Sequence, residues 1–351
     1  MGKIKIAVIG VGNISESHIN GYKNNATVEL YAFCDINETQ LKKQGEKYGV
    51  TRLYTDMNDL LALPEIDAVS VCTWNAAHAP CTIAALNAGK HVLCEKPMSV
   101  NKELAMEMQA AAEKNGKVLM IGFVRRFGND CAVLQDFINN DFFGELYYAK
   151  ATYLRRKGNP GGWFADKARS GGGPIIDLGV HVIDLTRYLM GNPKPVSVYA
   201  VSSQRLGDRK FIKTGPGWVP EDAKEDDVCT VEDFATALIR YDNGACTFLE
   251  TSYDLNGEDI GKKQLFGTKG GMDLSNGVKI YTTVNDYMAD IDVKTANLKG
   301  GKDMFVAEMS HFIDCVKNGT PCRAKAEDGI AVMKILDAIY ESARTGHEVI
   351  L

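Results

Sequence analysis

The chain has 351 residues, of which 45% are hydrophobic and 24% charged, so it is long enough for two domains with separate cores. Its formal net charge is −5 at pH 7 and both signs are interspersed, which makes nucleic acid and anionic membrane poor candidate partners. No apolar stretch approaches the roughly 20 residues that span a bilayer, and the start MGKIKIAVIGVGN lacks the cleavage site of a signal peptide, so we expect a cytoplasmic protein.

The first third of the sequence alternates between short apolar runs and amphipathic segments. The pattern predicts strands over residues 4–9, 28–34, 68–72, 91–94 and 118–121, and helices over 15–23, 38–48, 77–88 and 102–115. Strands that alternate with helices indicate a parallel sheet with right-handed crossover connections.

After Phe123 the pattern changes to successive strands. We expect a helix over 133–140, strands over 145–156, 196–203, 230–241, 245–253, 262–266, 272–274 and 279–281, and closing helices over 305–317 and 326–343. Turns such as DNGA indicate an antiparallel or mixed sheet with one covered face. The domain boundary is predicted near residues 122–127, which divides the chain into domains 1–123 and 124–351. The segment 205–227 is rich in Gly, Pro and charge, as is typical of a functional lid or an assembly contact.

The motif GVGNIS follows the first predicted strand directly. Gly10 and Gly12 suit a tight turn and a close approach to a pyrophosphate, and the helix amides at Asn13 and Ile14 suit its negative charge. The third position of the usual GxGxxG fingerprint is Ser15, which is small but not glycine. The motif predicts a dinucleotide site.

Asp35 ends the second predicted strand, where an acid binds the adenosine ribose hydroxyls. Its carboxylate would repel a 2′-phosphate, and no arginine follows it, so NAD is favoured over NADP. A helix N-cap is the alternative role of this side chain.

Two further strand ends carry polar side chains. Thr73, Asn75 and His78 follow the third long strand, at the edge where ligands of parallel sheets bind, although His78 also suits a purely structural role. The strand over 91–94 ends in Glu95-Lys96-Pro97, and Pro97 suits a rigid turn, with a cis Lys96–Pro97 bond as one form of it. Glu95 is expected either to orient Lys96 or to bind the nicotinamide ribose.

The stretch SGGGPIIDLGVHVIDL places Asp177 and His181 four residues apart on one helical face. A structural Asp–His hydrogen bond is one interpretation. The other is hydride transfer with a secondary alcohol, in which His181 takes the hydroxyl proton, Asp177 orients it or holds a neighbouring hydroxyl, and Lys96 stabilises the alkoxide. We expect Lys96 and His181 to converge on one carbon.

The GxGxx motif, EKP (95–97) and GGGPIIDLGVHVIDL together resemble the Gfo/Idh/MocA oxidoreductases, and the resemblance runs from residue 4 to the end. It implies a Rossmann domain followed by an α/β domain with a large open, mostly antiparallel sheet that forms homodimers or homotetramers. It also implies NAD(P), sugar or polyol substrates, and Lys96, Asp177 and His181 at the catalytic positions. The sequence departs from the family pattern at two positions. Ser15 stands where the third glycine is usual, and Trp74 stands where many members have proline.

Substrate contacts are predicted at Lys96, Asp177 and His181 and at two further side chains, Arg126 and Trp163. Arg155, Arg156 and Lys157 are weaker candidates because solvated charges are as common in such a segment. Two other functions are open: an NAD-retaining enzyme that eliminates or hydrolyses glycosides by transient oxidation, and a non-catalytic NAD-binding regulator.

Nine cysteines are scattered along the chain without a CxxC pair. Reduced, buried cysteines are therefore expected, and no metal site is predicted. The nine are Cys34, Cys72, Cys81, Cys94, Cys131, Cys229, Cys246, Cys315 and Cys322.

Overall fold

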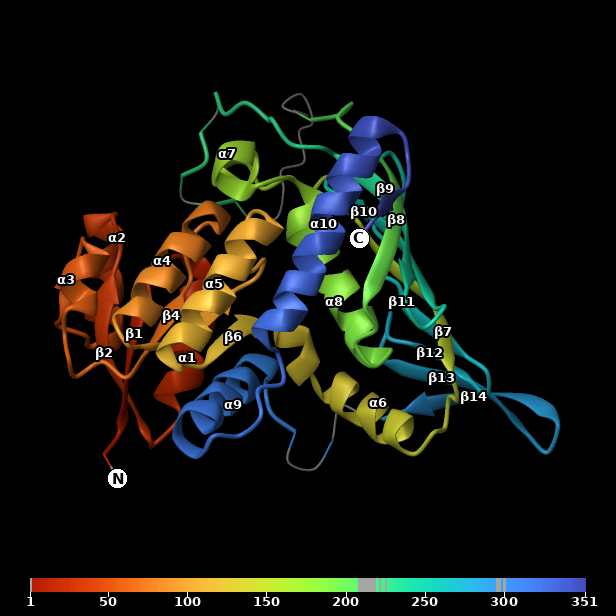
Figure 1. The fold of residues 1–351 in the computed structure, drawn as a ribbon, viewed down its shortest axis with the longest axis horizontal. Coiled ribbons are helices and arrows are strands. Elements are labelled where there is room, and N and C mark those ends of the chain that lie inside the picture. The colour runs from red at the N-terminus through yellow and green to blue at the C-terminus, as the bar shows by residue number, and fades with distance from the viewer. Residues whose placement is uncertain (1, 208–218, 221, 225, 295–297, 299–300) are drawn as a thin grey trace. The chain divides into compact units, whose positions relative to one another are not determined.

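A computed structural model describes residues 2–207, 219–220, 222–224, 226–294, 298 and 301–351 (Figure 1). The chain divides into two compact units, and each is described by itself. The first unit contains Met1–Phe127 and Lys302–Ile330, and the second contains Gly128–Gly301 and Ala331–Leu351. Residues 302–330 therefore belong to the first unit although they come late in the chain.

The first unit is built on a six-stranded sheet with the strand order β3-β2-β1-β4-β5-β6. All its strand pairs are parallel, which confirms the prediction from the alternating pattern. Its central strands are almost fully buried because helices cover both faces, and this explains their continuous apolar sequences. The strands are β1 (Ile4–Ile9), β2 (Val28–Cys34), β3 (Leu53–Tyr54), β4 (Ala68–Val71), β5 (His91–Glu95) and β6 (Leu119–Gly122).

Helices of the first unit follow the strands in alternation, as expected. They are α1 (Asn13–Lys23), α2 (Glu38–Tyr48), α3 (Met57–Leu61), α4 (Asn75–Asn87), α5 (Lys102–Asn115) and the late helix α9 (Met304–Asn318). Helix α9 lies against α1, where the absent side chain of Gly21 leaves room for Met309. The sequence pattern missed β3 and α3 because two and five residues are too few to show a period.

The second unit is built on a nine-stranded sheet with the order β14-β13-β12-β11-β7-β10-β9-β8-β15. Only β7 and β10 pair in parallel among the described strands, so the prediction of a mostly antiparallel sheet is confirmed. The strands are β7 (Leu146–Leu154), β8 (Pro195–Ser203), β9 (Phe234–Tyr241), β10 (Cys246–Ser252), β11 (Lys263–Gly267), β12 (Gly271–Asp273), β13 (Val278–Val284), β14 (Tyr287–Val293) and β15 (Val349–Ile350).

Helices lie on one face of this sheet, with α8 close to β7 and β10 (Figure 1). They are α6 (Asn129–Asn139), α7 (Lys167–Ser170), α8 (Val180–Leu189) and α10 (Ala326–Thr345), of which α10 crosses the division between the units. Strand β9 alternates between buried and more exposed side chains, as expected when one face is covered.

Part of the predicted loop 205–227 lies outside the described residues, including Trp218. No described helix has the length and apolar character needed to cross a membrane.

Candidate active site

The turn between β1 and α1 has the shape of a pyrophosphate cradle. Gly10 has φ +83°, and a Cβ at this position would lie 2.7 Å from the backbone carbonyl of Cys72. At Gly12 an added Cβ would meet nothing within 4 Å, so the backbone is open to a ligand. Ser15 is fully buried and its hydroxyl donates to the Gly12 carbonyl at 2.6 Å. A small serine thus satisfies the position that the fingerprint usually gives to a third glycine.

The N-terminus of α1 offers free donors for an anion. In the part of the chain that the structure describes, no side chain caps α1, whereas Asn37 caps α2 and Asn101 caps α5. The first amides of a helix have no partner within the helix, and they carry a partial positive charge. Asn13 and Ile14, which begin α1, are exposed. This turn therefore fits the phosphates of a dinucleotide.

Asp35 lies at the end of β2, beside the same turn. Its Oδ2 accepts the Val11 amide and its Oδ1 accepts the Asn37 amide, both at 2.8 Å. The N-cap interpretation is wrong, because Asn37 caps α2 through the amides of Thr39 and Gln40. A carboxylate has about four lone-pair sites, so Asp35 keeps capacity to accept two ribose hydroxyls while the backbone fixes its position.

His78 on α4 is buried and both of its ring nitrogens face carbonyl oxygens. Nδ1 lies 2.7 Å from Pro97 O and Nε2 lies 3.1 Å from Thr73 O. Burial lowers the pKa of His78, although the two backbone contacts oppose the shift. The ring therefore connects the start of α4 to the turn after β5, where the Lys96–Pro97 bond is cis. Asn75, the first residue of α4, is buried, and Thr73 just before it is half-buried.

Glu95, at the end of β5, has partners that the sequence did not reveal. Its Oε1 lies 2.7 Å from Nε2 of His18, and its Oε2 accepts the backbone amide of Lys96 at 3.1 Å. Nδ1 of His18 contacts the Ser70 hydroxyl, which also contacts Tyr22. Burial raises the pKa of Glu95, but the hydrogen bond and charge of His18, together with Lys96, outweigh it and leave the pKa below its ordinary value. The carboxylate therefore fixes the backbone that presents Lys96.

The lowered pKa of Glu95 predicts a pH-dependent contribution to stability. Its ionised form stabilises the fold at pH values above the unfolded pKa of about 4.3, and this contribution is lost as the pH falls through the lower folded pKa. We expect Glu95→Gln to lower the free energy of unfolding by about 1–3 kcal/mol at neutral pH and by less in acid. Urea unfolding of both proteins between about pH 7 and pH 3 measures this difference.

The matched control for this measurement is Glu103→Gln, because that side chain is 61% exposed. It should leave the unfolding free energy unchanged within about 0.5 kcal/mol. A deficit of Glu95→Gln that stayed constant across the pH range would contradict the assigned role of ionised Glu95.

In the second unit, the glycine-led helix begins against two partners. A Cβ on Gly172 would lie 1.8 Å from the Tyr340 hydroxyl, and a Cβ on Gly173 would lie 2.5 Å from the Glu232 carbonyl. The buried Glu232 carboxylate accepts the amides of Gly173 and Ile175 at 3.1 Å and the Tyr340 hydroxyl at 3.0 Å. Burial raises the pKa of Glu232, and these donors offset it only in part. The glycines thus allow Glu232 to cap the helix.

Asp177 lies on a π-helical turn, Ile175–Gly179, that leads into α8, where His181 is the second residue. The sequence predicted regular α-helical spacing between Asp177 and His181, but the structure has a π turn at Asp177. Such turns are frequent at functional sites. The Tyr253 hydroxyl donates to Asp177 Oδ2 at 3.0 Å. Burial and the charge of Asp177 raise the pKa of Tyr253, which keeps its hydroxyl protonated as a donor. Asp177 and His181 are both half-buried.

The candidate substrate residues have different surroundings. Arg155 donates to the Tyr153 hydroxyl at 3.2 Å. Burial lowers the pKa of Arg155, but Tyr153 and the charge of Asp177 outweigh it and raise the pKa, so a fixed cation lies near that carboxylate. Trp163 is half-buried and stacks on Phe164 with 3.8 Å between ring centroids. Of the other two weaker candidates, Lys157 forms a bridge to Asp254 through the backbone, and Arg156 donates its amide to Asp259.

Arg126 lies in a 3₁₀ turn after β6, and only 1% of it is exposed. Its Nη1 donates to the Arg323 carbonyl at 2.7 Å and to Asp328 Oδ2 at 2.8 Å. This pairing gives the guanidinium a structural role within the first unit.

The structure thus gathers the predicted cofactor residues of the first unit at one edge of its sheet. They all follow the carboxyl ends of β1, β2, β4 and β5, where parallel sheets bind ligands. Asp177, His181 and Trp163 belong to the second unit. His18, Tyr253 and Glu232 were missed, because each meets its partner only through the folded chain.

Comparison with known proteins agrees with this geometry. Residues 4–123 match the family model described as "Oxidoreductase family, NAD-binding Rossmann fold", and residues 132–273 match the "GFO/IDH/MocA C-terminal domain". The chain is 35% identical to D-glucoside 3-dehydrogenase of Escherichia coli, over 99% of this chain and 97% of that protein. It is 30% identical to myo-inositol 2-dehydrogenase of Thermotoga maritima, over 93% and 92%.

A solved structure supports the fold assignment. Aldose-aldose oxidoreductase from Caulobacter crescentus, complexed with glycerol, is 25% identical to the chain and superposes with a TM-score of 0.83 over 99% of this chain and 100% of that one. The cradle at Gly10, the acid at the end of β2 and the two family matches lead to one conclusion. The chain belongs to the Gfo/Idh/MocA oxidoreductases, with the NAD-binding Rossmann fold of that family.

Proposed function

We propose that this chain is an NAD-dependent dehydrogenase that transfers hydride between nicotinamide and a secondary hydroxyl of a sugar, glycoside or cyclitol. The observation that carries the proposal is the shared edge of Gly10, Gly12, Asp35 and Lys96 in the first unit. Strand β5 lies two positions from β1, which corresponds to about 10 Å at the spacing of neighbouring strands. A dinucleotide whose pyrophosphate binds at Gly12 can therefore extend its nicotinamide end toward Lys96.

In this proposal the protein's own residues hold and move the proton of the reacting hydroxyl. His181 accepts the proton as the alcohol is oxidised and returns it in the reverse direction. Lys96 donates a hydrogen bond to the same oxygen and stabilises its developing negative charge. Asp177, held by Tyr253, orients His181 or accepts a neighbouring substrate hydroxyl. A nicotinamide cofactor bound at this site would supply the hydride acceptor or donor.

Glycosides are the first substrates to test, because the relative with 35% identity along nearly the whole chain is named a glucoside 3-dehydrogenase. Asp177 and Arg155 provide an acceptor and a donor for sugar hydroxyls, and the Trp163 ring provides a plane against which a sugar can pack. Arg126 is the weaker of the substrate candidates because its guanidinium binds Asp328.

The test is a panel of glucosides, free aldoses and inositols, each mixed with the protein and NAD, with the absorbance of reduced nicotinamide as the readout. A glucoside-dependent increase supports the proposal. Product formation on retained cofactor without net NADH would instead support transient oxidation for glycoside elimination or hydrolysis. If cofactor-loaded protein converted no compound of a broad panel, both the dehydrogenase and the transient-oxidation functions would be refuted.

We further propose that Asp35 makes NAD the preferred cofactor over NADP. Asp35→Asn keeps an acceptor oxygen for the Val11 amide but removes the charge that repels a 2′-phosphate. At about 5 Å such a repulsion is worth on the order of 1–3 kcal/mol, so the ratio of kcat/KM for NADP to that for NAD should rise about 10- to 100-fold. Steady-state kinetics with both cofactors measures it. Asp59→Asn, at an exposed position, is the control, and an unchanged ratio in Asp35→Asn would contradict the assignment.

We also propose that the second unit forms a homodimer or homotetramer through the uncovered face of its sheet. Tyr199 and Val201 on β8 point to one face and are each 49% exposed, and Tyr199 pairs with Leu238 on β9. On the same face, Tyr148 stacks on Phe266. Leu238→Lys should shift the molar mass in solution toward the monomer, as light scattering on a sizing column would show. A wild-type protein that is monomeric at micromolar concentration would exclude this assembly.

A further inference from the structure

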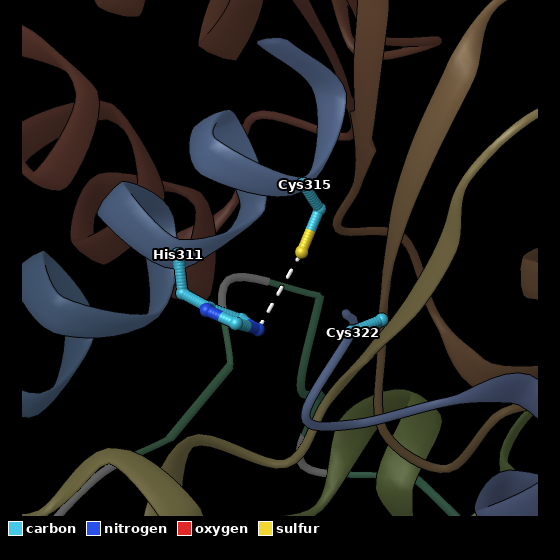
Figure 2. A group of neighbouring side chains, drawn as sticks. All are labelled: His311, Cys315 and Cys322. Atoms are coloured by element: carbon cyan, nitrogen blue, oxygen red, sulfur yellow. Dashed lines mark hydrogen bonds between the residues drawn. The ribbon is translucent and has the colours of Figure 1, made fainter. Parts of the chain in front are cut away.

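A group of three metal-ligating side chains lies in the first unit, away from the residues assigned to the cofactor. His311 and Cys315 are four residues apart on α9, so they lie on one face of that helix. Cys322 follows α9 in the segment that leads to α10 and lies opposite them (Figure 2). Their ligand atoms, one imidazole nitrogen and two sulfurs, all lie within 4.8 Å of one another.

One distance within this group matches that of a tetrahedral metal site. Bonds of about 2.3 Å from zinc to sulfur and about 2.05 Å to nitrogen, at a tetrahedral angle, separate the two ligand atoms by about 3.6 Å. The observed distance between Cys315 Sγ and His311 Nε2 is 3.5 Å. The sulfurs of Cys315 and Cys322 also lie within 4.8 Å of each other.

We propose that His311, Cys315 and Cys322 bind one thiophilic divalent cation, with Zn²⁺ as the preferred metal. Two thiolates and one imidazole form a donor set that suits zinc and is too soft for Mg²⁺ or Ca²⁺. Each thiol releases its proton to solvent when the cation binds. This inference does not depend on the proposed dehydrogenase activity, and it differs from the sequence-based expectation of no metal site.

The surroundings fix the imidazole and leave space for a fourth ligand. The ring of His311 lies against the ring of Phe127, with 5.4 Å between the ring centroids. The Arg323 guanidinium lies over the same Phe127 ring, 5.0 Å from its centroid. A cavity of about 350 Å³ is lined by both cysteines and by Glu327, so there is room for water beside the two sulfurs.

Metal binding must displace two existing hydrogen bonds of His311 Nε2, one from the Arg323 amide and one with the Cys315 thiol. The Arg323 amide donates to His311 Nε2 at 3.0 Å, and this lone pair is the one that would bind the cation. Two such hydrogen bonds are weak compared with the affinity of zinc for a site with two thiolates.

The sequence pattern could not reveal this site. The spacing His-x₃-Cys-x₆-Cys contains no CxxC pair, so the sequence favoured buried apolar cysteines. Only the return of the chain after α9 brings Cys322 back to the other two side chains (Figure 2).

The test is a titration of reduced, metal-free, full-length protein with Co²⁺ and then with Zn²⁺. One equivalent of Co²⁺ should produce a thiolate-to-cobalt charge-transfer band in the near ultraviolet, and Zn²⁺ should abolish it. Cys315→Ser and Cys322→Ser should each weaken Co²⁺ binding by at least about 100-fold. Cys246→Ser changes a half-buried cysteine on β10 of the second unit and should keep the band.

A second measurement keeps the inference testable if a serine variant fails to fold. Alkylation of wild-type protein, read by mass spectrometry, should show that Zn²⁺ protects Cys315 and Cys322 and leaves the modification of Cys246 unchanged. Absence of the cobalt band, a band that persists in both serine variants, or equal alkylation with and without Zn²⁺ would overturn the proposal. The proposal would also be overturned if the reduced protein took up no cobalt, while hydrogen peroxide oxidised Cys315 and Cys322 to a disulfide.

Discussion

Replacing His181 by alanine is expected to lower kcat by about 100- to 10,000-fold, because the variant lacks the proposed base for the substrate hydroxyl proton. Substrate binding should change much less, since Asp177 and its partner Tyr253 remain in place. Steady-state kinetics with the best substrate of the glycoside panel, across neutral to alkaline pH, measures both effects. The loss should shrink as the pH rises, because hydroxide then replaces the missing base.

The control for this variant is His347→Ala, because His347 is exposed and lies in the second unit like His181. It should retain wild-type kcat within about twofold. If His181→Ala lost less than about tenfold in kcat, another group would be the base and the assignment of His181 would be wrong.

Replacing Lys96 by alanine is expected to lower kcat by about 100- to 1,000-fold, because the developing alkoxide loses the donor and the positive charge that we propose Lys96 supplies. Methionine resembles the aliphatic part of the lysine side chain more closely than alanine does. Lys96→Met therefore separates the loss of charge from the loss of side-chain packing. The binding of NAD should weaken by less than about tenfold, since the cradle at Gly10 and the acid at Asp35 are unchanged. Stopped-flow measurement of hydride transfer, with a separate fluorescence titration of NADH, distinguishes the two effects.

Lys42→Ala is the matched control, because the Lys42 side chain is 69% exposed and its ion pair is with Glu38 on the same helix. Its rates should equal those of the wild type. A Lys96→Ala protein that kept the rate of hydride transfer but bound NADH about 100-fold more weakly would show a role in cofactor binding alone.

The sequence predicted the first unit well because its sheet is buried on both faces. Four-residue β4, for example, consists only of apolar or small residues, and all four are buried. The prediction missed β14 for the opposite reason. Its sequence, YMADIDV, places aspartates between apolar residues, and most of its side chains are exposed. A strand at the edge of a sheet is defined by its neighbour β13 rather than by burial.

The placement of the candidate site residues was predictable where it depends on local backbone. The Gly10 turn, the acid at Asp35 and Lys96 all follow strand ends that the sequence marks clearly. Contacts between distant residues were not predictable: His18 meets Glu95 across 77 positions, and Asp177 meets Tyr253 across 76. The same limit applies to Arg126, whose partner Asp328 is 202 residues away.

The cap on the glycine-led helix has a consequence for the end of the chain. Glu232 holds the first amides of that helix, and its carboxylate is itself bound by Tyr340 on α10. Trimming the C-terminus back past this tyrosine, or introducing a protease site there, would loosen the turn that presents Asp177. The last helix is therefore an indirect support of the proposed reactive centre, and fusion tags or truncations should spare it.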